Sequence, residues 1–215
     1  MTYEIRFQDM FDAASAIAQV ARSAKPAAPS LPPLFFITDP VRTPDPESIA
    51  KHLPHGCGII YRHFGDPLAS ARAANLRTVA GDRALTLLIG NDHDLALEIG
   101  ADGVHLSQKN LSLLPTLHQR YPQLKLSLAC HDLATLHDLP SDLPVQAVFV
   151  SPVFASLSPS AHGKPPLGVA GAHTFAHSTN LPVYGLGGIT AENIGDLCDA
   201  GLSGFGAVDA FSLKA

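Results

Sequence analysis

The sequence predicts a single (β/α)8 barrel of the TIM type, and three observations support that fold class. Short apolar segments alternate with helical segments about eight times, the pattern of parallel strands joined by helical crossovers. Several apolar segments are followed directly by polar residues, which is where barrel enzymes place their catalytic groups. The chain has 215 residues, of which 46% are hydrophobic. That is enough for one such domain with a large core, and too little for two domains of ordinary size.

The stretch from Leu87 to Leu106 shows the repeating unit best. An apolar run at residues 87–89 leads into a polar loop, and a short helical stretch continues to Ile99. Gly100 ends that helix, and residues 104–106 form a second buried strand. Strand, polar loop, helix and strand together make one βαβ unit.

The other elements are expected from the same apolar runs and helical spacing. Strands are expected at residues 34–37, 57–61, 84–89, 104–106, 125–130, 146–150, 182–186 and 204–208. Helices are expected at residues 46–52, 67–80, 94–99, 111–121, 133–139, 169–177 and 191–200. The loop at residues 151–168 is long and rich in Pro and Ser, and loops of this length are commonly functional.

Residues 1–33 are expected to form an N-terminal helix with a connector, and residues 34–215 to form the barrel domain. Apolar spacing predicts the helix over residues 4–22, and residues 25–33 are a Pro-rich connector. After the last strand the chain leaves room for one turn of an eighth helix at most. Either the N-terminal helix or a second copy of the chain, in a homodimer, is therefore expected to cover that strand.

Composition and charge exclude several classes of function. The net charge of −5 disfavours nucleic-acid binding, which usually needs a basic surface. No apolar run approaches the ~20 residues that span a membrane, and the polar, acidic start of the chain does not resemble a signal peptide. The three cysteines are far apart and lack CxxC spacing, which suits reduced thiols. We therefore expect a cytoplasmic protein that binds neither nucleic acid nor membrane.

The ends of the last two predicted strands are candidates for binding a phosphate group. Gly187 and Gly188 follow the seventh strand, and Ala207 and Val208 end the eighth. In barrels, these two loops commonly present backbone N–H groups to a phosphate. The alternative is that the two glycines only make a tight turn. Asp209 argues against phosphate, because a carboxylate repels it.

Five segments resemble the thiamine phosphate synthase family, which has thiazole tautomerase-like relatives. They are FFITD (35–39), LLIGNDHDLALEIGADGVHL (87–106), SPVF (151–154), PPLG (165–168) and GLGGITAENI (185–194). The resemblance runs from residue 34 to residue 211. It implies an enzyme that joins hydroxymethylpyrimidine diphosphate to a thiazole phosphate and releases pyrophosphate. It also implies small-molecule phosphate esters as ligands, Mg2+ as cofactor, and a dissociative step in which the thiazole nitrogen captures a pyrimidine carbocation.

Matched to the family's motifs, three side chains acquire catalytic roles by resemblance. Arg62 would contact the diphosphate, and its alternative is an ordinary ion pair. The family's lysine two places later is Phe64 here. His131 matches a histidine implicated in proton transfer in the tautomerase-like branch, and its alternative is a hydrogen-bonded structural histidine. Lys164 would replace the loop lysine that the family has at the position of Pro159.

The same matching assigns binding residues. Ser156 and Ser158 match the family's phosphate-binding threonine pair, and Ser151 begins the same loop. Asp92, displaced by one residue from the family's Asn-Asp, and Asn110 are the candidate Mg2+ ligands. Asn is a weaker ligand than a carboxylate for a hard cation. The alternative role for Asp92 is to cap the helix that follows it.

Two functions stay open at the level of the sequence. The first is a thiamine phosphate synthase-like transferase that works with substituted side chains. The second is a degenerate relative, either a tautomerase-like proton-transfer enzyme or a phosphate-ester binding protein without synthase activity. Substitutions relative to the family at Phe64, Asn110, Ala129 and Pro159 fall among the expected site positions, so the residues alone do not choose between the two.

Overall fold

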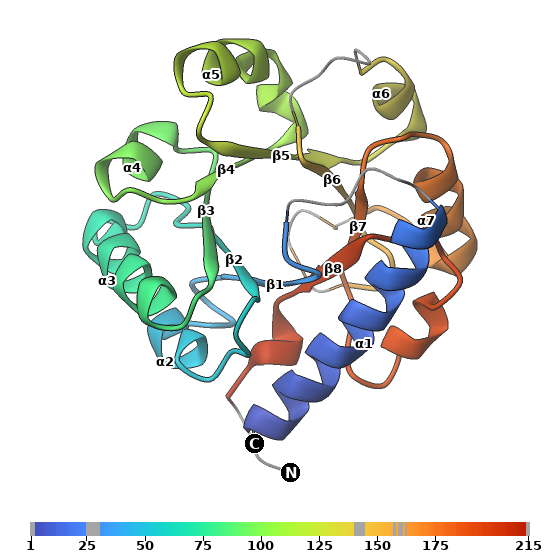
Figure 1. Cartoon of the computed structure of the whole chain (residues 1–215), viewed down its shortest axis with the longest axis horizontal. Helices are drawn as coiled ribbons and strands as arrows, with labels where there is room; N and C mark the ends of the chain where they lie inside the picture. Colours follow the sequence, from blue (N-terminus) through green and yellow to red (C-terminus); the bar gives the residue numbers. More distant parts are fainter. Residues whose placement is uncertain are drawn as a thin grey trace.

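Eight parallel strands form a closed barrel in the computed structural model, which describes residues 3–24, 31–139, 145–156, 158, 161 and 163–213 (Figure 1). Each strand pairs with the next along the chain, and β8 pairs with β1 to close the ring. This arrangement confirms the predicted (β/α)8 class. Residues 25–30 of the predicted connector and Pro159 lie outside the described residues.

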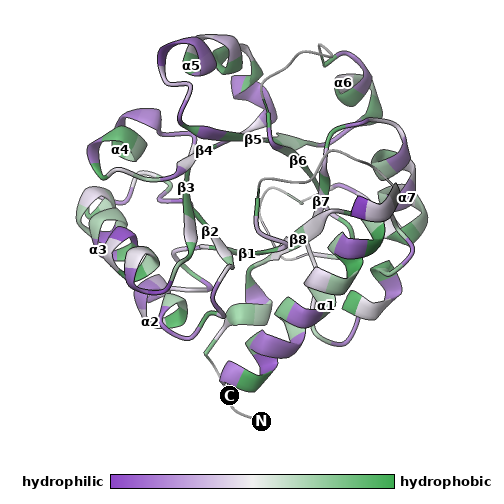
Figure 2. Cartoon of the chain, viewed as in Figure 1, coloured by the Kyte–Doolittle hydropathy of each residue, from purple (hydrophilic) through white to green (hydrophobic). Residues whose placement is uncertain are grey.

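The strands lie close to their predicted positions. They are β1 (Leu34–Ile37), β2 (Gly58–Tyr61), β3 (Thr86–Gly90), β4 (Gly103–Leu106), β5 (Lys125–Cys130), β6 (Ala147–Val150), β7 (Val183–Leu186) and β8 (Gly204–Ala207). Nearly all of their residues are buried, because helices cover the outside of the ring and side chains fill the inside. In Figure 2, hydrophilic residues are concentrated on the surrounding helices.

The helices of the barrel are short. They are α2 (Pro46–Ala50), α3 (Ala69–Asp82), α4 (His93–Glu98), α5 (Leu114–Arg120), α6 (Leu133–His137) and α7 (Gly168–His177), with 3-10 turns η1 (Gln108–Leu113), η3 (Ile194–Leu197) and η4 (Asp209–Phe211). Asp45, Asp92 and Asp132 cap α2, α4 and α6, each accepting the backbone N–H three residues later. No helix among the described residues is long and apolar enough to cross a bilayer.

Two predicted helices differ in the structure. The prediction of a helix over residues 191–200 is wrong, because only the 3-10 turn η3 forms there. Asn193 explains part of this: its side chain binds the N–H of Thr190 and the carbonyl of Gly188, so it holds the chain in a loop. The predicted helix over residues 111–121 is split into η1 and the shorter α5.

Aromatic side chains fill the interior of the barrel. Phe35 packs edge-on against Phe149, with 5.5 Å between ring centroids, and Phe149 stacks on Tyr184 at 4.9 Å. The Tyr184 hydroxyl donates to the carbonyl of Leu31, which precedes β1. The amino-terminal part of the barrel is therefore a packed core, and the open space lies at the carboxyl ends of the strands.

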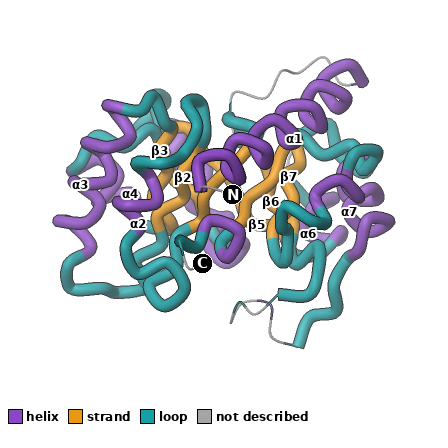
Figure 3. Tube along the Cα trace, turned by 90° about the horizontal axis from the view of Figure 1, so that it is seen from below, coloured by secondary structure: helices purple, strands orange, loops and turns teal. Residues whose placement is uncertain are grey.

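Helix α1 (Tyr3–Ala24) covers the side of the barrel where an eighth helix would lie (Figures 1 and 3). The buried ring of Phe7 meets Phe211 of η4 edge-on at 5.0 Å, and Phe211 meets Phe36 of β1 at 5.4 Å. Arg6 Nη2 donates to the carbonyl of Ser212 at 2.6 Å. Of the two covers expected for β8, the structure shows the N-terminal helix.

Candidate active site

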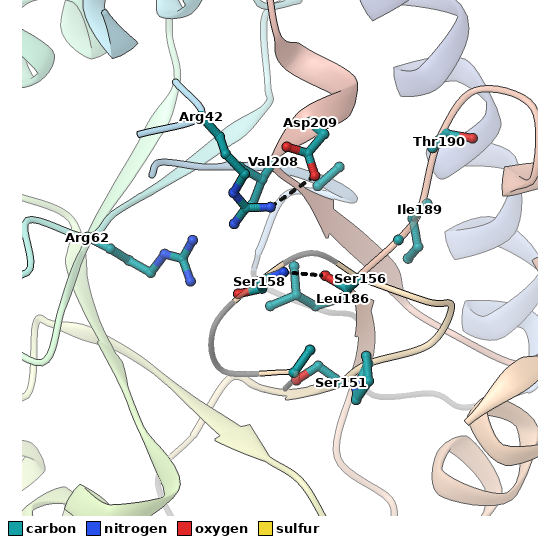
Figure 4. Close-up of a pocket in the computed structure, with 15 residues that line it drawn as sticks. Arg42, Arg62, Ser151, Ser156, Ser158, Leu186, Ile189, Thr190, Val208 and Asp209 are labelled. Carbon is teal, nitrogen blue, oxygen red and sulfur yellow. Dashed lines mark hydrogen bonds and ion pairs between the residues drawn. The ribbon is translucent and has the colours of Figure 1, made fainter. Parts of the chain in front are cut away.

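A cavity of about 540 Å3 lies at the carboxyl ends of the strands, within the usual range for small-molecule sites. Its lining comes from the ends of β1 to β7 and consists of Asp39, Pro40, Val41, Arg42, Arg62, Phe64, Gly90, Asn91, His105, Ser107, Ala129, His131, Ser151, Ser158 and Leu186. A side pocket of about 50 Å3 adjoins it beside β7 and β8 (Figure 4). The two spaces form one site, because they share the lining residues Arg42, Arg62, Ser151, Ser158 and Leu186.

The side pocket gathers all seven residues that the sequence suggested for phosphate. These are Ser151, Ser156, Ser158, Gly187, Gly188, Ala207 and Val208. They come from the loops after β6, β7 and β8, which are far apart in the sequence and meet at one end of the barrel. The Ser156 hydroxyl accepts the backbone N–H of Ser158 at 3.2 Å, which shapes the first of these loops. Their role as phosphate ligands stays a prediction.

The loop after β7 needs glycine for two reasons. Gly187 and Gly188 have φ angles of +97° and +67°, which other residues adopt at a cost. A Cβ on Gly188 would also lie 2.3 Å from the carbonyl oxygen of Ala155, in the loop after β6. The glycines therefore do make a tight turn, and the same turn lines the pocket.

Arg62, at the end of β2, points into the space that the cavity and the side pocket share (Figure 4). Its Nε donates to the carbonyl of Thr38 at 2.9 Å, and its Nη2 lies 3.7 Å from Asp39 Oδ2. Nη2 is buried and has no hydrogen-bond partner among the described residues. Burial lowers the pKa of Arg62 to about 10, which still leaves it charged at neutral pH. It can thus donate to an anionic ligand.

A second arginine, Arg42, bridges two carboxylates beside Arg62. Its Nη2 lies 2.9 Å from Asp39 Oδ2, and its Nη1 lies 2.9 Å from Asp209 Oδ2. The repulsion expected between Asp209 and a phosphate is therefore offset by a cation that directly contacts Asp209. No local sequence signal marks Arg42, because one of its partners follows β1 and the other follows β8.

His131 lines the cavity at the end of β5. Its Nδ1 lies 3.2 Å from the Ser151 hydroxyl, and its backbone N–H donates to Gln108 Oε1 at 2.8 Å. Burial, and then the charge of Lys164, lower the pKa of His131, so that its neutral form is favoured. Lys164 itself is exposed and lines neither the cavity nor the side pocket.

The two candidate Mg2+ ligands are engaged within the protein. Asp92 caps α4 through Oδ1, which accepts the N–H of Leu95 at 2.9 Å, and its Oδ2 lies 3.2 Å from His63 Nε2. Asn110 donates through Nδ2 to Asn91 Oδ1 at 2.9 Å. Within the described ranges no three His, Cys, Asp or Glu residues cluster as metal ligands. This donor set does not fit a magnesium site made by the protein alone.

The family model described as thiamine monophosphate synthase matches residues 34–211, from β1 to η4. The chain belongs to this family. It is 32% identical over 148 residues to the thiamine-phosphate synthase of Laribacter hongkongensis, an alignment that covers 69% of this chain and 68% of the relative. It is 30% identical over 142 residues to that of Albidiferax ferrireducens, covering 65% and 63%. The chain thus spans about two thirds of the length of these relatives.

A solved structure shows the same fold. The thiamine phosphate pyrophosphorylase from Pyrococcus furiosus superposes with a TM-score of 0.71 and 22% sequence identity, covering 82% of this chain and 85% of that one. At that identity the likeness concerns the barrel and its connections. The family assignment comes from the sequence matches.

For a member of the thiamine monophosphate synthase family, this site departs from the expected pattern at Phe64. Phe64 is 68% exposed, has a φ of +49°, and lies with its ring 5.2 Å from the Arg62 guanidinium carbon. A non-glycine residue with positive φ is uncommon and tends to occur at functional sites. An aromatic ring therefore stands at the mouth of the cavity, where the family is expected to place a cation.

His105, in the GADGVHL segment typical of the family, makes the stability of the protein depend on pH. It is buried inside the barrel, its Nδ1 lies 2.9 Å from the Ser127 hydroxyl, and burial lowers its pKa from 6.5 to about 3. Below pH 6.5 the unfolded chain binds a proton there that the folded chain does not, so stability falls as pH falls. We expect a loss of about 2 to 3 kcal/mol between pH 6.5 and pH 4.5.

Denaturant unfolding at several pH values checks this expectation. His105→Gln removes the titrating group, so its stability curve should be flatter than that of the parent by the same amount. His118→Gln, an exposed change on α5, should leave the slope as it is. Parallel curves for His105→Gln and the parent protein would contradict the assignment.

Proposed function

We propose that this protein is a thiamine phosphate synthase, joining hydroxymethylpyrimidine diphosphate to a thiazole phosphate with release of pyrophosphate. The observation that carries the proposal is the side pocket with its glycine and serine lining, which adjoins the larger cavity at Arg62. The family assignment and the names of the similar proteins give the reaction.

In this proposal the side pocket fixes the thiazole phosphate. Backbone N–H groups at Gly188 and Val208 and the hydroxyl of Ser158 are the donors we assign to the phosphate oxygens. Holding the phosphate there aims the thiazole nitrogen at the cavity. The thiazole then loses its orientational freedom when it binds, so this loss no longer adds to the activation barrier.

Arg62 is assigned to the departing pyrophosphate. The step that breaks the C–O bond leaves negative charge on the pyrophosphate and positive charge on the pyrimidine carbon. A buried guanidinium already held by Thr38 and Asp39 needs little reorganisation to stabilise that anion. We assign His131 to hold the Ser151 hydroxyl in place, with its own ring neutral.

Magnesium is a separate proposal that rests on the family resemblance. When bound, Mg2+ would neutralise charge on the diphosphate and its leaving group. Asp92 and Asn110 are the residues that the resemblance assigns to the ion, and both already have protein partners. Both oxygens of Asp92, the one carboxylate of the pair, would have to release their protein partners in order to bind the ion. Loss of product in EDTA and its return with added Mg2+ would support this part.

One assay tests the proposed reaction. Purified protein is incubated with hydroxymethylpyrimidine diphosphate, the thiazole phosphate and Mg2+, and thiamine phosphate and pyrophosphate are measured. Equal amounts of both products are expected. If no product forms while the thiazole phosphate still raises the melting temperature, the protein is a phosphate-ester binding relative and the proposal fails.

Location and assembly are further proposals. The three cysteines, Cys57, Cys130 and Cys198, are free thiols, which is typical of the reducing cytoplasm. A homodimer is not required to cover β8, since α1 does so. Sedimentation of the purified chain would decide whether a homodimer forms.

Restoring the family's cation at position 64 is expected to improve use of the diphosphate substrate. In Phe64→Lys the KM for hydroxymethylpyrimidine diphosphate should fall roughly fivefold, because an exposed charge pair contributes up to ~1 kcal/mol. The KM for the thiazole phosphate should not change. Phe64→Leu is the matched control, since it removes the ring without adding charge. A Phe64→Lys variant that matches Phe64→Leu in both KM values would contradict the prediction.

A further inference from the structure

The junction of the cavity and the side pocket is charge-balanced by four side chains. Arg42 and Arg62 supply two positive charges, and Asp39 and Asp209 supply two negative ones. All four line one or both parts of the site. A phosphate entering the side pocket therefore meets a cluster that is already neutral, and it gains more attraction if one of the two carboxylates leaves its arginine.

The two carboxylates on Arg42 are held very differently. Asp39 is 7% exposed and also accepts the backbone N–H groups of Val41 and Arg42. Burial raises its pKa, but the hydrogen bonds and charge of Arg42 outweigh this and hold the pKa below its usual value. Asp39 is therefore a fixed part of the fold.

Asp209 is held loosely by comparison. Its side chain is 53% exposed and, among the described residues, pairs only with Arg42. It begins η4, a single 3-10 turn that follows β8. An exposed ion pair of this kind contributes little free energy, so Asp209 can leave Arg42 at small cost.

Arg42 has unused capacity to donate hydrogen bonds toward an anion. A guanidinium carries five N–H groups, and in Arg42 the Nε is buried without a hydrogen-bond partner in the described part of the chain. The side chain is 16% exposed, and Figure 4 shows it paired with the neighbouring Asp209 at the edge of the pocket. If Asp209 moved away, Nη1 would be free to bind another oxygen anion.

We propose that the Asp209 carboxylate stands in for a phosphate oxygen on Arg42, and that an incoming phosphate monoester displaces it. Arg42 then binds the ligand's phosphate, and Asp209 lowers the affinity by competing for the same N–H group. The inference rests on the phosphate-binding part of the proposed function and not on its chemistry. It identifies Arg42 as a ligand-binding residue and Asp209 as a residue that sets affinity.

Titration with inorganic phosphate tests the competition directly. Asp209 is exposed, so Asp209→Asn should fold normally, and we expect its Kd for phosphate to be roughly twofold to fivefold lower than that of the parent. Asp199→Asn, the same change at an exposed site in the segment leading into β8, should leave the Kd unchanged. Arg42→Gln should weaken binding at least tenfold and abolish the gain from Asp209→Asn in the double variant.

Three results would overturn the proposal. The first is a Kd for Asp209→Asn that matches Asp199→Asn, and the second is absence of phosphate binding in both the parent and Asp209→Asn. The third is a gain from Asp209→Asn that persists in the Arg42→Gln background, which would show a general charge effect. If Arg42→Gln does not fold, Arg42→Lys takes its place, and the gain should shrink there because Lys cannot bridge two groups in the same geometry. Because the titration needs no turnover, a missing synthase activity and a missing competition are separate results.

Discussion

Arg62→Gln is expected to lower kcat/KM for thiamine phosphate formation by roughly 100-fold or more, the usual loss when one preorganised donor to a developing anion is removed. Gln can keep a hydrogen bond to the Thr38 carbonyl, so it removes mainly the charge. The loss should appear largely in kcat, because the anion that Arg62 is assigned to stabilise develops as the C–O bond breaks. Steady-state rates of pyrophosphate release measure it.

Two further variants separate this effect from damage to the fold. Arg62→Lys keeps the charge but not the planar fork, and it should recover only part of the rate. Arg120→Gln, an exposed arginine in α5, should have parental kinetics and a parental melting temperature. If Arg62→Gln retains more than a third of the parental kcat, the assignment of Arg62 to the leaving pyrophosphate is wrong.

The barrel and the gathering of the phosphate candidates were predictable from the sequence because they depend on local signals. A buried parallel strand is a short apolar run, and the turn after it is marked by Gly or a polar residue. In a barrel all carboxyl ends face one way, so placing Ser151, Gly187 and Val208 each at a strand end was enough to bring them together.

Arg42 was not predictable in the same way, although it lies at the centre of the charges in the site. Its role depends on Asp209, 167 residues later, and the two meet only because β8 closes the ring against β1. Nothing in the local sequence distinguishes Arg42 from a solvated arginine. The only available signal was indirect: an acidic residue at position 209, at an expected phosphate site, requires a nearby cation.

Asp92 shows the limit of matching motifs one residue out of register. The shift places its carboxylate at the N-cap of α4. There the backbone N–H of Leu95 donates to Oδ1, and the His63 ring lies next to Oδ2. The sequence left two roles open for Asp92, a Mg2+ ligand and a helix N-cap. Either role places a polar residue directly after a strand, so the sequence cannot choose between them. Only the geometry of the loop shows that the cap is formed, and whether a metal also binds there stays a prediction.

Phe7→Ala is expected to lower the free energy of unfolding by about 3 to 5 kcal/mol, the usual cost of truncating a fully buried aromatic ring. Phe7 is fully buried and packs on Phe211, which in turn contacts Phe36 of β1. The variant removes the central contact by which α1 takes the place of an eighth helix. Chemical denaturation of the whole chain measures the loss.

The same variant tests whether α1 supports the phosphate pocket. Phe211 ends the turn that Asp209 begins, so loosening Phe211 should let Asp209 leave Arg42 more easily. Because Asp209 competes with phosphate for Arg42, the Kd for inorganic phosphate should then fall. Val20→Ala, a truncation on the exposed face of α1 where Val20 is 55% exposed, should alter neither quantity by much. If Phe7→Ala costs no more stability than Val20→Ala, the helix is an appendage and the barrel is closed without it. If Phe7→Ala loses much stability but its phosphate Kd is unchanged, α1 stabilises the fold and does not affect the phosphate pocket.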